Sequence, residues 1–341
     1  MAIHNASPAT NGDVYVPMDQ RDGAESVVWF TRDLSAEGLR KAFAKVAATI
    51  DGKVAIKLHT GEKHGPNIIP RKWVAELVEK DLPEATIIET NTYYVGDRDT
   101  TAKHLETLKV NGWTFCPVDI TDDEGYTELP VAGGKWFDTM AVGSHLPQYD
   151  SMLTLTHFKG HMMGGFGGSN KNIGIGCASG KEGKLWIHAQ TSDNGKTWGA
   201  QWSVAQEELM EKITESTKAT IDHFGDKVVY VNVMRNMSVS CDCEGIAAQP
   251  VVTPNVGILA STDICAIDSA CVDLVWAMTD AGLVGNHDLV ERITTRHGLR
   301  QLSYMHELGM GNWRYQLLDL DHDEAPIAPA DAVTGVVPFE G

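Results

Sequence analysis

The sequence predicts an α/β protein with a mostly parallel sheet covered on both faces, a β excursion and a long glycine-rich loop. Two patterns carry this prediction. Short, nearly continuously apolar runs alternate along the chain with amphipathic helical segments, and this order favours parallel strands joined through helices. The runs lack the alternating polar residues of a half-exposed strand, so both faces of each strand are expected to be buried.

Seven strands are expected, one for each apolar run: residues 27–30, 54–59, 86–90, 115–120, 153–158, 228–234 and 257–261. Seven helices follow from the spacing of apolar residues: 39–50, 71–80, 101–110, 206–223, 263–278, 289–296 and 301–308. Pro70 suits the first turn of the second helix. Ser203 with Gln206 resembles a capping box ahead of the fourth, and Thr262 or Asp263 is expected to cap the fifth.

The chain is expected to form one main domain between two irregular ends. We expect residues 1–24 to be a flexible arm, residues 25–320 a single α/β domain, and residues 321–341 a tail that contains proline and alanine. The domain could consist of two intimate lobes, about 25–150 and 151–320, because single cores rarely grow beyond ~250–300 residues.

Charge and cysteine usage narrow the classes of partner. The formal net charge of −18 disfavours nucleic acid and anionic membranes as partners and is compatible with a homodimer. No signal peptide or membrane-spanning run is recognisable, so we expect a cytoplasmic protein. Six cysteines in so long a chain are not a disulfide framework, and in a reducing compartment they are either buried residues or metal ligands.

Residues 121–143 suggest a hairpin-like excursion, whereas residues 160–202 are glycine-rich and weakly periodic. The second segment follows an expected strand, at the edge where open α/β sheets bind ligands. Five glycines between 160 and 168 let backbone N–H groups approach a ligand, and Lys159 and Lys171 add positive charge. A small anionic molecule is therefore the expected partner; the alternative is a flexible surface lid. The candidate binding residues are Gly165, Gly167, Gly168, Asn170, Lys171 and Asn172.

The pair Cys241-Asp-Cys243 follows the expected strand 228–234. Two thiols one residue apart can converge on one metal in a turn, but zinc and iron–sulfur sites need about four ligands. Cys177 is the candidate third ligand, and His157, His161 or His188 the fourth. The alternative is two ordinary thiols in a loop. No CxxC motif occurs, which excludes a locally built ferredoxin-type cluster.

Two further loops follow the expected strands 54–59 and 86–90. The first carries His59 and Glu62, which could move protons, although a solvated turn explains them equally well. The second carries Asp97 and Asp99, which together with Glu62 could hold a divalent metal ion through oxygen.

These residues together resemble the family called domain of unknown function 362, whose members are often labelled iron–sulfur centre proteins. The similarity covers about residues 25–320. The matching stretches include residues 54–62, Asn91-Thr92, residues 156–161, 165–168 and 171–179, Cys241-Asp-Cys243, residues 257–260 and residues 307–311. The resemblance implies a shared α/β fold, and it implies that Lys159, His161, Lys171, Cys177, Cys241 and Cys243 are recurring positions. Many members carry an inserted pair of ferredoxin-type cysteine motifs, but residues 186–202 here contain no cysteine.

The leading hypothesis is a metal-dependent enzyme, of oxidoreductase or lyase type, that acts on a small anionic metabolite. In it Cys177, Cys241, Cys243 and His157 hold a metal ion or iron–sulfur cluster. Lys159 and Lys171 position the anion, and the catalytic set is His59, Glu62, Lys159 and His161. The alternatives are a non-catalytic anion- or cofactor-binding protein and a divalent-metal phosphate-ester enzyme that uses Asp97, Asp99 and Glu62.

Overall fold

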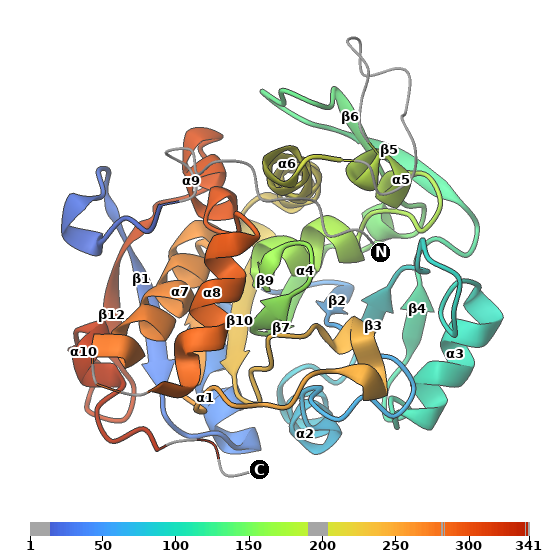
Figure 1. Ribbon diagram of the computed structural model, residues 1–341. Helices are drawn as coiled ribbons and strands as arrows, with labels where there is room; N and C mark the ends of the chain where they lie inside the picture. The colour runs from blue at the N-terminus through green and yellow to red at the C-terminus, as the bar shows by residue number, and fades with distance from the viewer. Residues whose placement is uncertain (1–13, 190–203, 281, 283, 338, 340–341) are drawn as a thin grey trace.

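A nine-stranded sheet runs through the centre of the protein, as the computed structural model shows for residues 14–189, 204–280, 282, 284–337 and 339 (Figure 1). The strand order is β13-β12-β1-β11-β10-β7-β2-β3-β4. The strands are β1 Glu25–Thr31, β2 Val54–Lys57, β3 Thr86–Glu89, β4 Val118–Ile120, β7 Ser151–His157, β10 Val228–Met234, β11 Gly257–Ser261, β12 Arg314–Asp319 and β13 Ala325–Pro326. The seven expected strands are all present, with boundaries shifted by up to three residues.

Strand direction explains where a site can form. The neighbours β4, β3, β2, β7 and β10 are parallel, whereas β11 is antiparallel to both β10 and β1. The carboxyl ends of five adjacent strands therefore meet at one edge of the sheet, and the loops that leave them lie side by side.

Helices cover both faces of the sheet. They are α1 Ala36–Ala44, α2 Arg71–Asp81, α3 Thr101–Val110, α4 Ser169–Gly176, α5 Gly183–His188, α6 Gln206–Phe224, α7 Ile264–Asp280, α8 His287–Thr295, α9 Arg300–Glu307 and α10 Pro329–Ala332. Along β10, Tyr230 packs into the core beneath α6 and α7, while Val229 and Val231 pack into the core beneath α1 and α2. The predicted α/β class with a doubly covered, mostly parallel sheet is confirmed.

The excursion predicted over residues 121–143 is a hairpin of β5 Tyr126–Pro130 and β6 Thr139–Gly143. Strand β12 was not predicted. It pairs with β1 near the edge of the sheet and buries only alternate residues, so it lacks the continuous apolar run of the other strands.

The prediction of a long loop over residues 160–202 is wrong for residues 160–189, the part that the structure describes. This segment folds into a hairpin of β8 Lys159–His161 and β9 Gly165–Gly167, followed by α4 and α5. Its glycines permit close backbone packing: a Cβ on Gly160 would lie 2.4 Å from the carbonyl oxygen of Val239, and one on Gly174 would lie 2.3 Å from that of Ile213. Glycine here reflects tight packing of regular elements and not a flexible lid.

Contacts also fix parts of the expected arm and tail. Arg21 is buried and forms a 2.5 Å ion pair with Asp273 of α7, to which the Tyr15 hydroxyl also donates. In the tail, Ala332 and Val333 are buried against the core.

Asp263 caps α7 by accepting from the N–H of Ala266, as predicted. The predicted capping residue Ser203 lies outside the described residues, and α6 follows Ala205, which makes no side-chain cap. None of the helices in the described part of the chain is long and apolar enough to cross a membrane.

Candidate functional site

The loop after β10 presents two cysteines at the carboxyl edge of the sheet. Cys241 is the N-cap of a 3-10 helix, Asp242–Ala247, and its sulfur accepts from the backbone N–H of Glu244. The Glu244 carboxylate in turn accepts from the N–H of Cys241 at 3.0 Å. This reciprocal cap fixes the turn and brings Cys243 back beside Cys241.

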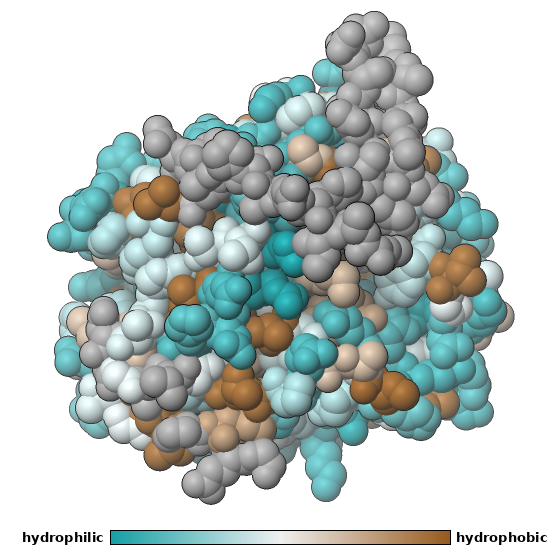
Figure 2. All heavy atoms as spheres, viewed as in Figure 1, coloured by the Kyte–Doolittle hydropathy of each residue, from teal (hydrophilic) through white to brown (hydrophobic). Residues whose placement is uncertain are grey.

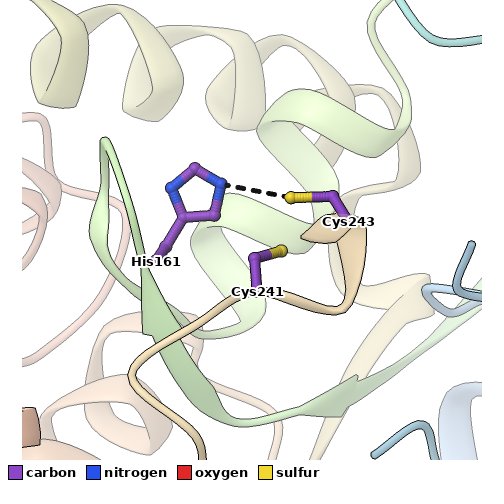
Figure 3. Close-up of side chains that lie close together, drawn as sticks. All are labelled: His161, Cys241 and Cys243. Atoms are coloured by element: carbon purple, nitrogen blue, oxygen red, sulfur yellow. Dashed lines mark hydrogen bonds between the residues drawn. The ribbon is translucent and has the colours of Figure 1, made fainter. Parts of the chain in front are cut away.

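His161 on β8 faces both sulfurs (Figure 3). The sulfurs of Cys241 and Cys243 and a ring nitrogen of His161 all lie within 4.8 Å of one another, and the Nε2 of His161 is 3.9 Å from the sulfur of Cys243. The Nδ1 of His161 accepts from the backbone N–H groups of Met163 and Gly164, at 3.1 and 2.9 Å. Because Nδ1 is an acceptor, the proton of the neutral ring is on Nε2 and points to the sulfurs.

His59, which follows β2, repeats this arrangement. Its Nδ1 accepts from the N–H of Gly61 at 2.9 Å, and its side chain forms a hydrogen bond with Cys241. Burial lowers the pKa of both imidazoles, that of His161 to about 4, so both rings are neutral near pH 7. Two Nε2–H groups therefore point at the cysteine pair.

The two thiols are electrostatically unequal. A hydrogen bond from Cys243 holds the pKa of Cys241 well below its usual range against the opposing effect of burial, and His161 adds to this. The same bond and burial raise the pKa of Cys243. The two thiols therefore titrate as one coupled pair.

Lys159 and His157 are tied to Asp242, which lies between the two cysteines. Lys159 donates to the Oδ2 of Asp242 at 3.0 Å, and the Nδ1 of His157 lies at hydrogen-bond distance, 2.8 Å, from the same oxygen. The Nε2 of His157 lies 2.7 Å from the carbonyl oxygen of Arg235. Both ring nitrogens of His157 are thus occupied, so its predicted role as a metal ligand is corrected: it anchors the loop of Cys241 and Cys243 to β7.

Lys171 on α4 differs from Lys159. It is half-buried, and no residue of the described chain offers it a hydrogen bond or an ion pair. Burial lowers the pKa of its ammonium, and the neighbouring Cys241 and Cys243 oppose that shift. An enclosed lysine without a partner costs folding free energy, and an anionic ligand would repay that cost.

The other predicted anion-binding groups are already occupied by the protein. The backbone N–H groups of Ser169 and Asn170 donate to the carboxylate of Asp268, at 2.7 and 2.9 Å. A Cβ on Gly168 would lie 2.5 Å from that carboxylate, and one on Gly165 would lie 2.8 Å from the backbone of Gly298. The glycine-rich segment therefore binds the carboxylate of Asp268, which burial leaves with a pKa raised to about 6.

The predicted residues Asn170, Asn172 and Gly167 also have local roles. Asn170 is buried and donates to Thr214 and Gln301, whereas the Oδ1 of Asn172 accepts from the Nζ of Lys57 at 3.0 Å. A Cβ on Gly167 would lie 3.6 Å from Lys159. Of the six predicted anion-binding residues, Lys171 alone remains without an internal partner in the described chain.

Cys177 is not part of the site. It lies at the end of α4 in the apolar core, and burial raises the pKa of its thiol to about 12. Cys265 and Cys271 are buried on α7, and Cys116 is half-buried near β4. All six cysteines are described, and only Cys241 and Cys243 share a site, so a four-cysteine cluster does not fit this chain.

The loops after β2 and β3 hold a separate network of charges that are paired. The Oε1 of Glu62 accepts from the Tyr94 hydroxyl at 2.6 Å and from two nitrogens of Arg98 at 2.7 and 2.9 Å. Asp97 pairs with Lys63, and Asp99 pairs with Lys103. The three carboxylates predicted to hold a divalent ion are thus each bound to a cation and do not converge, which is a correction.

Sequence reasoning missed Asp242 and Asp268. Asp242 carries a weak signal, since it stands between two candidate ligands, whereas nothing in the sequence connects Asp268 to the glycines 100 residues earlier. In the space-filling view, hydrophilic residues gather on the face of the molecule over β9 and α4 (Figure 2). Two surface grooves, of about 290 and 260 Å³, are lined by other residues, near Tyr315 and Arg300.

Comparison with known proteins gives a family and a distant fold likeness. Lactate racemase apoprotein from Thermoanaerobacterium thermosaccharolyticum aligns with a TM-score of 0.38 and 13% identity, over 64% of this chain and 52% of that one. A structural-genomics crystal structure from Thermotoga maritima aligns with a TM-score of 0.33 and 14% identity, over 58% and 50%. The chain thus spans about half the length of these structures.

No curated protein matches the sequence. The family model described as domain of unknown function (DUF362) matches residues 54–273, which include β2, β7, β10 and both cysteines of the site. The resemblance expected from the sequence is confirmed, and the chain belongs to the DUF362 family.

Proposed function

We propose that this protein is a metal-dependent enzyme that acts on a small anionic molecule at the site of Cys241 and Cys243. One observation carries the proposal: two sulfurs and an imidazole nitrogen lie within 4.8 Å of one another beside Lys171, a lysine without a partner in the described chain. Thiolate and imidazole together favour a soft or borderline metal such as zinc or iron.

The donor set fits a single metal ion better than a cluster. Three protein ligands leave one coordination position for a substrate, as in catalytic zinc sites. The sulfurs of Cys241 and Cys243 already lie within 4.8 Å of each other and can bind the ion once the proton between them is lost. His161 must transfer its proton from Nε2 to Nδ1 and give up the two backbone bonds to Nδ1, so we expect it to complete a site that the cysteines establish.

The chain's own residues have distinct roles in this proposal. Lys171 binds the anion, and His59 holds a proton at Nε2 next to the sulfur of Cys241. Lys159 keeps a fixed position through Asp242. A bound metal would supply Lewis acidity toward an oxygen of the anion.

Elemental analysis of anaerobically purified protein tests the proposal. We expect close to one Zn or Fe per chain. Cys241→Ser and Cys243→Ser should each weaken metal binding by more than the roughly 10–100-fold typical of changes outside the ligand shell. Cys177→Ala, a thiol buried in the core, is the matched control and should retain the metal. Metal well below one equivalent in the unaltered protein would overturn the proposal.

The second candidate is a non-catalytic anion-binding protein, and the unpartnered Lys171 favours it independently of the thiols. It predicts anion binding that survives the double change Cys241→Ser/Cys243→Ser and is lost in Lys171→Met. If anion binding requires both cysteines, the metal-dependent enzyme is favoured.

A further inference from the structure

We infer that the rim of the sheet's carboxyl edge is a docking surface for a second, acidic protein. The rim consists of the loops after β2, β3 and β10, the turn of the β8–β9 hairpin and the end of α8. The inference goes beyond the proposed function and does not depend on it, because the side chains that carry it do not bind the metal or the small anion in that proposal. Two observations support it: the position of the most exposed apolar side chains and the position of the unpaired arginines.

The most exposed large apolar side chains, apart from those at the two ends of the described chain, all lie on this rim. Val95, Ile246 and Met162 are 89%, 80% and 53% exposed. They belong to the loop after β3, the loop after β10 and the β8–β9 turn. Single exposed apolar residues are common, but a group of them on one surface marks an interaction site.

Contacts between the loops place two of these side chains on one surface. The hydroxyl of Tyr94, the residue before Val95, donates to Glu62 at 2.6 Å. A Cβ on Gly245, the residue before Ile246, would lie 3.0 Å from the Cβ of the same Glu62. The loops after β3 and β10 therefore meet at Glu62 in the loop after β2.

A further contact joins the third side chain to them. His161, the residue before Met162, lies 3.9 Å from the sulfur of Cys243 in the loop of Ile246 (Figure 3). Each of the three apolar residues thus directly follows a residue that contacts a neighbouring loop. Together they border the pair of cysteines.

The arginines without a carboxylate partner gather in the same place. The structure describes all ten arginines, and six of them form ion pairs. The other four, which form no ion pair within the described chain, are Arg71, Arg235, Arg292 and Arg296. In a protein with a net charge of −18, carboxylates are plentiful, so four unpaired arginines at one edge are unexpected.

Arg235 and Arg71 lie on the side of α2. Arg235 follows β10, and its guanidinium carbon lies 5.6 Å from the centre of the Trp73 ring. Its Nη1 lies 3.5 Å from the carbonyl oxygen of Ile68, in the loop after β2. Arg71 is the first residue of α2, directly after that loop.

Arg292 and Arg296 lie on the side of α8. Arg292 donates to the carbonyl oxygen of Val239 in the loop after β10 at 3.0 Å. Arg296 follows one turn later, and its Nε is buried and has no hydrogen-bond partner among the described residues. A Cβ on Gly298 would lie 3.1 Å from the carbonyl oxygen of Gly164, so this end of α8 packs against the β8–β9 turn.

Nearby carboxylates do not satisfy these cations. Asp242, near Arg235, is already paired with a lysine. Glu244, near Arg292, already caps the turn of the cysteine loop. Carboxylates of a partner would form charge-assisted hydrogen bonds with the free guanidinium groups, while its apolar side chains cover the three exposed tips.

Charge and composition favour a different protein over the other possible occupants. A symmetric dimer through this rim would place the unpaired arginines of one copy against those of the other. An anionic membrane is repelled by the net charge of −18. Arginine and methionine are enriched at protein interfaces, whereas lysine is depleted.

Photo-crosslinking in the native host identifies the partner. The full chain with Val95→benzoylphenylalanine and that with Ile246→benzoylphenylalanine should capture the same protein, and this protein should carry a net negative charge. Val110→benzoylphenylalanine is the matched control, because Val110 is 39% exposed at the far end of α3. It should not capture that protein.

Binding of the purified partner then tests the surface itself. Arg71→Gln and Arg296→Gln remove side chains that donate no hydrogen bond within the described chain, and each should weaken binding by about three- to ten-fold. Ile246→Asp should weaken it by at least about ten-fold. Both arginine effects should shrink in roughly 0.5 M salt. Arg40→Gln changes the net charge equally but lies beside Asp81, at the opposite end of α2, and should bind normally.

Three results would overturn the inference. The first is the absence of a common crosslinked protein, or a partner whose affinity is unchanged in Arg71→Gln and Arg296→Gln. The second is self-association in sedimentation equilibrium that Ile246→Asp abolishes, which would assign the rim to a second copy. The third is binding to phosphatidylserine vesicles that the same variant abolishes, which would assign it to a membrane. None of these measurements uses metal content, so the proposed function is tested separately.

Discussion

Two regions share the carboxyl edge of the sheet and differ in how their charges are satisfied. Over β2 and β3, buried Lys57 donates to Glu89 at 2.8 Å, and Arg98 binds Glu62. Over β7 and β10, Lys171 has no partner in the described chain, and the sulfurs of Cys241 and Cys243 lie within 4.8 Å of each other. Both regions are rich in residues that catalyse reactions in other proteins. The difference indicates that unsatisfied groups, more than residue type, mark the candidate site.

Removal of a partner from the paired region should produce the largest change in stability. Although burial opposes ionisation of Glu89, Lys57 and nearby cations hold its pKa below the usual range. Lys57→Met would leave this carboxylate buried without its closest cation, and we expect the free energy of unfolding to fall by about 3–5 kcal/mol. Denaturant titration measures this. The double variant Lys57→Met/Glu89→Gln should recover part of the loss, and an unchanged midpoint for Lys57→Met would contradict the comparison.

A second prediction concerns Asp268. Its carboxylate accepts from N–H groups at the start of α4, and this helix carries both Lys171 and Asn172, the latter bonded to Lys57. Burial raises the pKa of Asp268 from 3.8 to about 6, so between these values the folded protein binds more protons than the unfolded chain. The contribution of Asp268 to stability is therefore complete below about pH 4 and falls as pH rises to about 6. At 1.36 kcal/mol per unit, the fall is about 3 kcal/mol.

Comparison of the unaltered protein with Asp268→Asn isolates this effect, because the amide does not titrate. As pH rises over that range, the unaltered protein should lose about 3 kcal/mol of unfolding free energy relative to Asp268→Asn. Parallel pH profiles would show that the backbone N–H groups of Ser169 and Asn170 keep the carboxylate ionised throughout.

The fold was largely predictable because its strands are continuous apolar runs, and the β10 run led directly to Cys241 and Cys243. The site was predictable only in part. His161 was recognised as a candidate, but His157 was placed in the metal-ligand set; the β8–β9 hairpin, which turns His161 toward the sulfurs, has no apolar pattern that would predict it.

Long-range pairing explains the errors. The glycines resembled an anion-binding loop, but the anion bound there is the carboxylate of Asp268, about 100 residues away, and its donors are the N–H groups of Ser169 and Asn170. Cys177 was expected in that loop beside the other thiols, yet α4 places it in the core. A single sequence records which polar groups are present, but it does not record which of them are already paired within the fold.

The smallest predicted change in stability distinguishes the two regions most sharply. Lys171→Met removes a half-buried cation that has no partner in the described chain, so we expect the free energy of unfolding to change by less than about 1 kcal/mol. The same variant should weaken binding of inorganic phosphate, used as a probe anion, by about ten-fold, which corresponds to roughly 1.4 kcal/mol. Calorimetry with phosphate and thermal unfolding measure the two effects.

Lys159→Met, a change on strand β8, is the matched control. It removes the cation that pairs with buried Asp242, so it should lower stability more than Lys171→Met does. If Lys171→Met destabilises the protein as much as Lys159→Met, then Lys171 has a structural partner and the distinction between satisfied and unsatisfied regions fails. If phosphate binds equally well to Lys171→Met, the anion site lies elsewhere. Loss of phosphate binding at unchanged stability is the combination that only a ligand-directed lysine gives.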